Sequence, residues 1–109
     1  MKVYLDDERP APKGWIRVKT PEETIEFLKT NRVTYLSLDH DLGLPEDRTG
    51  YTVLLWIEQQ CEEGGFLPPH ITIHTANAGA RARMDAAVES IEMRAHHVRR
   101  SLEINNSRE

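Results

Sequence analysis

Three clusters of polar side chains stand at the ends of short apolar runs, and their residue types could do chemistry. They are Asp6–Glu8, Asp39–Asp41 and His74–Asn77. Each follows a run whose residues are typical of a buried strand. In an open parallel sheet, the ligand crevice lies beyond the carboxyl ends of the strands. We therefore expect the three clusters to meet in space if the sheet is parallel.

Carboxylates gathered in a partly desolvated crevice repel one another unless a cation neutralises them. A hard divalent cation, Mg²⁺ or a similar ion, is the simplest solution because it prefers oxygen ligands. One Asp pair after a strand is usually a turn or a solvated cap. The joint placement of Asp6, Asp7, Asp39 and Asp41 is what favours a metal site.

Two histidines are candidates for moving a proton at such a site. His40 lies between two carboxylates that could orient its ring, and His74 ends an expected strand. If Ile71 and Ile73 face a helix layer, alternation along the strand turns His74 to the other face. A purely local hydrogen bond is the alternative for each histidine.

Three further residues are candidates for binding phosphate. Arg9 follows the first acidic cluster, and Arg81 begins the last expected helix. Each arginine could clamp a phosphate, or it could balance nearby acids or solvate the helix start. Asn77 precedes the same helix, where free backbone N–H groups can bind an anion; an ordinary N-cap is the equal alternative.

Periodicity and turn residues predict four strands and three helices along the chain. The strands are Lys2–Leu5, Trp15–Lys19, Val33–Leu38 and His70–Thr75, and the helices are Pro21–Asn31, Tyr51–Glu63 and one long helix from Ala80 onward. Pro10, Pro12 and Gly14 deny a helix between the first two strands. This order points to a layered α/β domain.

The last helix carries an apolar stripe from Met84 to Leu102 that could outrun the sheet and form a homodimer contact. We expect residues 103–109 to be a frayed tail. Trp15 and Trp56 are expected in the core or an interface, because large aromatic side chains are usually placed there.

Composition limits the function classes. The chain has 109 residues and a formal charge of −4, which suits a single domain over residues 1–109 and argues against general nucleic-acid coating. The lone cysteine, Cys61, excludes an internal disulfide and is expected in the core. With no apolar run of membrane length and no signal-peptide pattern, we expect a cytoplasmic protein without membrane partners.

The runs Tyr4–Glu8, Ser37–Asp39 and His74–Ala76, with Leu44–Pro45 and Gly50, resemble the receiver domain of response regulators across roughly residues 2–90. The resemblance implies a flavodoxin-like three-layer sandwich, here with a reduced, mostly parallel sheet of about four strands and a missing first crossover helix. It also implies roles for single residues: Asp6 and Asp7 as metal ligands, Asp39 as metal ligand and possible nucleophile, Thr75 as phosphoryl-binding hydroxyl, and the carbonyl of Asp41 as a further metal ligand.

Two features differ from ordinary signalling receivers. A typical receiver has a fifth strand that ends in a lysine, whereas this chain has no lysine after Lys29. The histidine-containing runs Leu38–Gly43 and His74–Asn77, followed by Gly79, Arg81, Arg83 and Met84, are similar to the cyclic-phosphate-processing receiver domains. That group implies metal-assisted handling of a cyclic phosphate, with RNA ends and RNA repair as the suggested setting.

Three hypotheses follow. The first is a Mg²⁺-dependent phosphoesterase acting on a cyclic phosphate such as an RNA 2′,3′-cyclic end, with His40 or His74 as acid and base. The second is a phosphoacceptor or phosphate-binding module without turnover. The third is a structural remnant whose acids only bind a cation; loss of the Asp6 and Asp7 charges would then stabilise the metal-free protein.

Overall fold

The computed structural model describes residues 1–45 and 48–107, and the side chains of these residues up to Arg100 except Val98. Seven elements follow one another along the chain: β1 (Lys2–Leu5), β2 (Ile16–Val18), α1 (Pro21–Leu28), β3 (Tyr35–Leu38), α2 (Gly50–Glu63), β4 (His70–Ile73) and α3 (Ala78–Ser107). All seven predicted elements are present, and only their ends differ.

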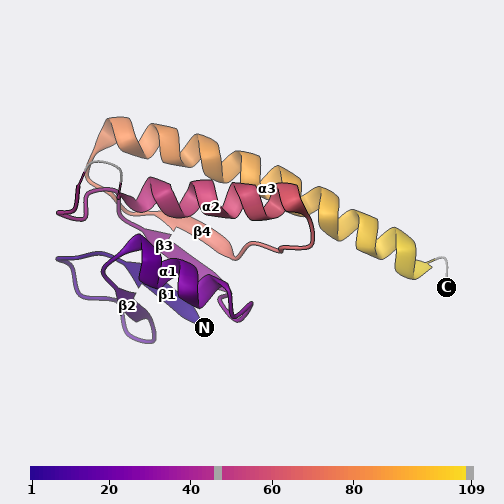
Figure 1. The fold of residues 1–109 in the computed structure, drawn as a ribbon, viewed down its shortest axis with the longest axis horizontal. Helices are drawn as coiled ribbons and strands as arrows, with labels where there is room; N and C mark the ends of the chain where they lie inside the picture. Colours follow the sequence, from indigo (N-terminus) through magenta and orange to yellow (C-terminus); the bar gives the residue numbers. More distant parts are fainter. Residues whose placement is uncertain (46–47, 108–109) are drawn as a thin grey trace.

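The strands form one sheet in the order β2-β1-β3-β4, with every neighbouring pair parallel (Figure 1). The parallel arrangement is the condition on which the meeting of the three polar clusters depended. The connection from β1 to β2 contains no helix, as Pro10, Pro12 and Gly14 predicted. The receiver-like α/β fold with a reduced sheet is therefore confirmed.

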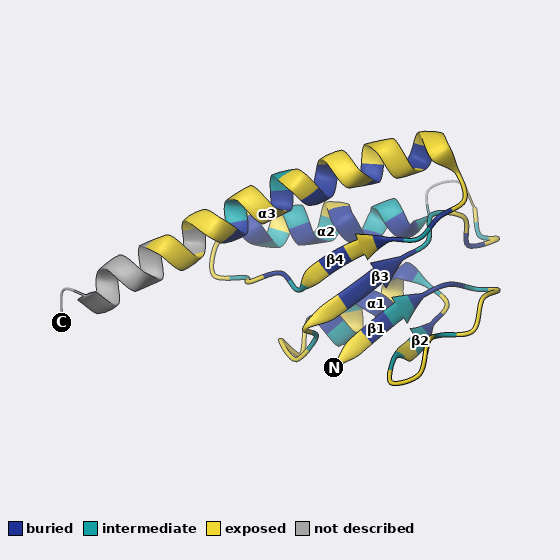
Figure 2. Ribbon diagram, turned by 180° about the vertical axis from the view of Figure 1, so that it is seen from behind, coloured by how far each residue is buried: buried dark blue, intermediate teal, exposed yellow. Residues whose placement is uncertain are grey.

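The helices cover one face of the sheet, so the expected three-layer sandwich is corrected to two layers. Contacts run from α1 to α2 and from α2 to α3, while α1 also contacts β1 and α3 contacts β4. Figure 1 shows this helix layer in front of the strands, and Figure 2 shows the sheet from behind, with the strands in front of the helices. No helix of the described residues covers the other face, because the connection from β1 to β2 contains none.

Alternation along each strand sends the aliphatic side chains into the helix layer. Val3, Leu5, Leu36 and Leu38 have no exposed surface, and Ile71 and Ile73 are also buried. The helices supply the other half of the core through buried residues that include Leu28, Val53, Leu54, Ile57, Cys61, Met84 and Ile91. Cys61 thus lies in the core, as expected.

Residues 78–107 form one continuous helix rather than a helix, strand and second helix. Met84, Val88, Ile91 and Ala95 are buried along its inner face, whereas the side chains of Val98 and Leu102 lie outside the described part. The backbone remains helical to Ser107, so the tail expected to fray from residue 103 is helical to that point. Figure 1 shows α3 projecting past the end of α2. Within the described residues, no helix is long and apolar enough to cross a membrane.

Candidate active site

Three ionisable residues stand directly after three neighbouring strands. Asp6 follows β1, Asp39 follows β3 and His74 follows β4. Their backbone N–H groups continue the hydrogen bonding of the sheet by one residue. The N–H of Asp6 donates to the carbonyl of Val18, that of Asp39 to Leu5 and that of His74 to Leu38, each at 3.0 Å. The sheet backbone therefore fixes all three residues at its carboxyl edge.

Asp6 is buried and fully engaged. Its Oδ1 accepts the backbone N–H groups of Glu8 and Arg9, both at 2.8 Å, and its Oδ2 lies 3.1 Å from His74 Nε2. Burial by itself would raise the pKa of Asp6, but the two backbone N–H donors and His74 outweigh it and lower the pKa below its ordinary value. Asp6 is thus an ionised carboxylate whose hydrogen bonds also hold the backbone at the start of the β1–β2 loop.

His74 is held on three sides. Its Nδ1 lies 2.7 Å from Ser37 Oγ, its Nε2 faces Asp6, and its ring stacks on Tyr4 with centroids 4.2 Å apart and planes 5° from parallel. Burial lowers the pKa of His74, although the charges of Asp6 and Asp39 oppose that shift. The ring is therefore neutral near pH 7. Because ionised Asp6 can only accept, the proton is assigned to Nε2, and Ser37 donates to Nδ1.

Asp39 and the following loop are held by α2. Thr49 caps this helix, its hydroxyl accepting the N–H of Tyr51. The N–H of Gly50 donates to the carbonyl of His40 at 3.2 Å, and a Cβ on Gly50 would overlap the carbonyl oxygen of Asp39. Glycine is needed here because the helix start presses directly on the backbone of the site.

A cavity of about 240 Å³ opens at this edge of the sheet. Its described lining consists of Asp6, Asp7, Glu8, Arg9, Asp39, Asp41, Gly43, Thr75 and Ala76. Five of these residues are acids and one, Arg9, is a cation. The Arg9 guanidinium also donates from Nη1 to the carbonyl of His74 at 3.2 Å. The structure thus brings the four expected metal ligands, Arg9 and Thr75 around one opening.

Four predicted site residues do not line this cavity: His40, His74, Asn77 and Arg81. His40 Nδ1 lies 2.8 Å from Asp41 Oδ1, so a neighbouring carboxylate does orient its ring. Asn77 accepts the N–H of Ala80 through its side chain at 3.0 Å and acts as an ordinary N-cap of α3. Arg81 is exposed, with its Nε 3.9 Å from an Asp85 carboxylate oxygen. The geometry favours the local alternative for Asn77 and Arg81.

The donor set suits a divalent cation. One ligand atom each of Asp6, Asp39 and His74 lies within 4.8 Å of the other two. Asp7 and Asp41 line the same opening. Carboxylate oxygens suit Mg²⁺ and Mn²⁺. His74 neighbours this group, with Nε2 facing Asp6 and Nδ1 bonded to Ser37. The residues present therefore fit a bound cation, with carboxylates as the main ligands.

Sequence reasoning missed two neighbours of His74. Ser37 and Tyr4 were noted only as members of strand motifs, yet one hydrogen-bonds the histidine and the other stacks on its ring. Strand alternation was the available signal, since it places both on the helix-free face with His74. Trp15 was expected in a core or an interface, but it is only half-buried on this face, with its ring 6.2 Å from Tyr4. Trp56 does pack at the core, against Phe66.

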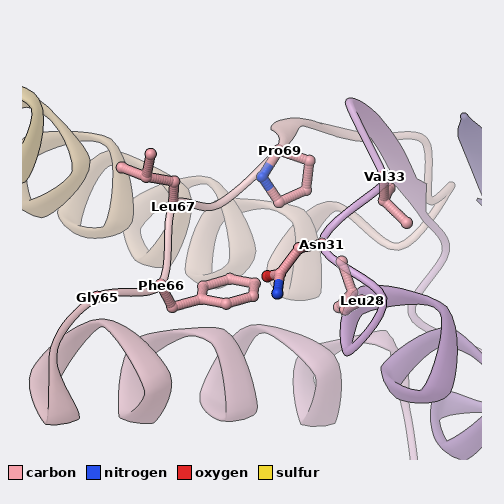
Figure 3. Close-up of a pocket in the computed structure, with 7 residues that line it drawn as sticks. All are labelled: Leu28, Asn31, Val33, Gly65, Phe66, Leu67 and Pro69. Carbon is pink, nitrogen blue, oxygen red and sulfur yellow. The ribbon is translucent and has the colours of Figure 1, made fainter.

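A second cavity, of about 250 Å³, lies at the opposite edge of the sheet (Figure 3). It lies between the end of α1 and the segment that leads into β4, and its described lining is Leu28, Asn31, Val33, Gly65, Phe66, Leu67 and Pro69. None of these side chains ionises or acts as a nucleophile. The chemistry therefore concentrates at the carboxyl edge.

Comparison with known proteins agrees with this geometry. No curated protein and no solved structure matches the chain. A family model described as "Cyclic-phosphate processing Receiver domain" matches residues 1–90, which include all four strands and every residue of the acidic cavity. The chain belongs to the family of cyclic-phosphate processing receiver domains.

Proposed function

We propose that the protein is a metal-dependent phosphoesterase that opens a cyclic phosphate, with the 2′,3′-cyclic end of an RNA as the preferred substrate. The observation that carries the proposal is the convergence of Asp6, Asp39 and His74 at one end of the sheet. Asp6 and Asp39 line a cavity whose lining also includes Arg9 and Thr75, and His74 contacts Asp6. Ester hydrolysis needs proton transfer, which a positioned histidine can supply.

Hydrolysis of the ring adds one water. The water oxygen attacks phosphorus, one ribose P–O bond breaks, the water loses a proton, and the departing ribose oxygen gains one. A divalent cation held by Asp6, Asp7, Asp39 and Asp41 would supply charge neutralisation and activation of water or of the phosphoryl group. Arg9 is placed to bind a phosphate oxygen, and Thr75 can donate its hydroxyl, since its Oγ1 already accepts from the N–H of Asn77.

His74 is our candidate for the proton transfer. Neutral His74 carries its proton on Nε2, the nitrogen that faces the carboxylate edge, while Ser37 and Tyr4 fix the ring. It can take a proton from the attacking water at its unprotonated ring nitrogen, and the imidazolium that results can give the Nε2 proton to the departing oxygen, so the cycle balances. His40 is the alternative, because Asp41 orients its ring beside the same cluster.

The test uses a short RNA ending in a 2′,3′-cyclic phosphate, incubated with Mg²⁺ or Mn²⁺ and read by the mass of its end group. We expect the gain of one water in wild type and its loss with EDTA or in Asp39→Asn. His74→Gln should lower the rate roughly 10²- to 10⁴-fold, the usual contribution of a general acid or base. The same loss in His40→Gln instead would transfer the role to His40.

Asp85→Asn is the matched control, because Asp85 is an exposed aspartate on α3 that does not line the cavity. It should keep the wild-type rate. Absence of ring opening with metal binding intact would refute the RNA-end proposal. A stable phosphoryl adduct on Asp39, formed from a small phosphate donor without turnover, would support the phosphoacceptor module instead. A homodimer through α3 remains a prediction, and sedimentation of the full chain tests it.

A further inference from the structure

The helix-free side of the sheet, here called the open face, carries a set of aromatic and cationic side chains. Its described strand positions and the residues next to them are Lys2, Tyr4, Trp15, Arg17, Tyr35, Ser37, His70, Thr72 and His74. Figure 2 looks onto this face, over which no described helix passes. A receiver-like sheet that lacks its first helix thus leaves one surface accessible.

The rings on the open face form a connected row that runs from Trp15, directly before β2, over β1 and β3 to β4. Tyr4 meets Trp15 edge-on at 6.2 Å, Trp15 meets Tyr35 at 6.5 Å, and Tyr35 meets His70 at 5.6 Å. Tyr35 is 44% exposed, and His70 is exposed as well. Edge-on contacts do not stack one ring face on another, so planar groups can stack on these rings.

The row reaches the proposed active site through His74. This histidine stacks on Tyr4 and, on its other side, faces Asp6 at the cavity. Along β3, Tyr35 precedes Asp39 by four residues, which is about 13 Å at the rise of a strand. A ligand whose phosphate sits beside Asp39 can therefore lay its next groups along the rings.

The charge of the open face indicates what kind of ligand it would bind. Lys2 Nζ lies 5.3 Å from the Tyr35 ring centre and 5.8 Å from that of Trp15, and Arg17 lies on the neighbouring strand. The strand positions of this face, all within the described residues, include no carboxylate. This cationic surface on a chain of net charge −4 complements a polyanion. A second copy of the chain would instead bring these cations against their own equivalents.

We propose that the open face binds single-stranded RNA, stacking about two or three bases on Tyr35, Trp15 and His70 while Lys2 and Arg17 contact the backbone phosphates. Aromatic rings on an open four-stranded sheet are a recognised means of holding unpaired bases. This inference rests on the proposed function and deepens it: the substrate is an oligonucleotide recognised through its terminal bases rather than a free cyclic nucleotide.

Binding is measured apart from chemistry, with a labelled single-stranded RNA ending in a 3′-hydroxyl and with EDTA present. We expect Tyr35→Ala and His70→Ala each to raise Kd at least about fivefold, the usual scale for loss of one stacked base. His96→Ala is the matched control, because His96 is an exposed histidine on α3, away from the sheet. It should bind as wild type does. A duplex of the same sequence should bind more weakly, since its bases are already stacked.

Trp15 gives a direct readout of the same event. In a Trp56→Phe background it is the only tryptophan, and we expect RNA to quench its fluorescence. Wild-type affinity in Tyr35→Ala and His70→Ala would overturn the inference, as would quenching of Trp15 by self-association without RNA. If the variants weaken RNA binding as expected but no ring opening is found, the proposed function is refuted and the RNA-binding surface is supported. If a cyclic mononucleotide is opened as fast as the RNA, the proposed function stands and this inference falls.

Discussion

Replacing Asp6 by alanine tests whether this acid is a strained member of a repelling cluster or part of the framework of the fold. Simple repulsion among the carboxylates predicts that losing one charge stabilises the metal-free protein. The structure predicts the opposite. Asp6 accepts two backbone N–H groups at 2.8 Å and faces His74 at 3.1 Å while only 1% of its surface is exposed.

The size of the loss follows from those bonds. A hydrogen bond to a charged acceptor contributes about 1.5–3 kcal/mol, and part of that is recovered when water reaches the freed donors. For two backbone donors and one ring donor we expect Asp6→Ala to lower the free energy of unfolding by about 3 kcal/mol. Asp6→Asn should lose less, because its amide oxygen can still accept the N–H groups of Glu8 and Arg9.

Urea unfolding in EDTA, followed by tryptophan fluorescence, measures the effect as a shift of the midpoint. Asp7→Asn is the control, since Asp7 lines the same cavity and losing its charge also relieves repulsion. An Asp6→Ala protein as stable as wild type, or more stable, would refute the reasoning. The lowered pKa of Asp6 adds a second signature: its stabilisation is fully present well above the ordinary value of 3.8 and is lost as the pH falls through the lower pKa of the folded protein. Asp6→Ala should lack that loss.

Other predictions concern the support of the site. Gly50→Ala should destabilise the protein by about 2 kcal/mol and reduce activity, because its Cβ would overlap the Asp39 carbonyl; Gly79→Ala, with only ordinary contacts, should be neutral in the same assays. Ser37→Ala should cost about 1–2 kcal/mol on urea unfolding by freeing His74 Nδ1. Burial raises the pKa of Cys61, so thiol titration should find it unreactive at pH 8 in the native state and reactive in urea. Rapid native labelling would contradict that placement.

Local patterns in the sequence were sufficient for much of the fold. The β1 bounds agree with the structure, and Pro21 after the capping residue Thr20 marks the start of α1 as predicted. Strand ends differed from expectation: β2 is one residue shorter at each end, and β4 ends at Ile73 because His74 and Thr75 continue into the site. The long last helix was predicted from apolar residues at helical spacing, of which those from Met84 to Ala95 are buried along its inner face.

The candidate residues were also readable, because polar clusters after apolar strands are a local feature. The contacts that these residues make with one another could not be predicted from the sequence. That Asn77 caps a helix, and that Arg81 stays outside the cavity, depends on the direction in which α3 leaves β4. The pairing of Ser37 and Tyr4 with His74 depends on strand order, since residues 4, 37 and 74 become neighbours only across β1, β3 and β4.

The sequence by itself determined which elements form, that the first crossover has no helix, and which acids and histidines end the strands, because propensity, capping and alternation act within a few residues. Only the tertiary structure decided that all described helices lie on one face, that Asp6 is buried and hydrogen-bonded, and that the rings of Tyr4, Trp15 and Tyr35 form one connected row. Those outcomes depend on the lateral order and parallel register of the strands. Contacts between residues distant in sequence set that order, and no local pattern encodes it.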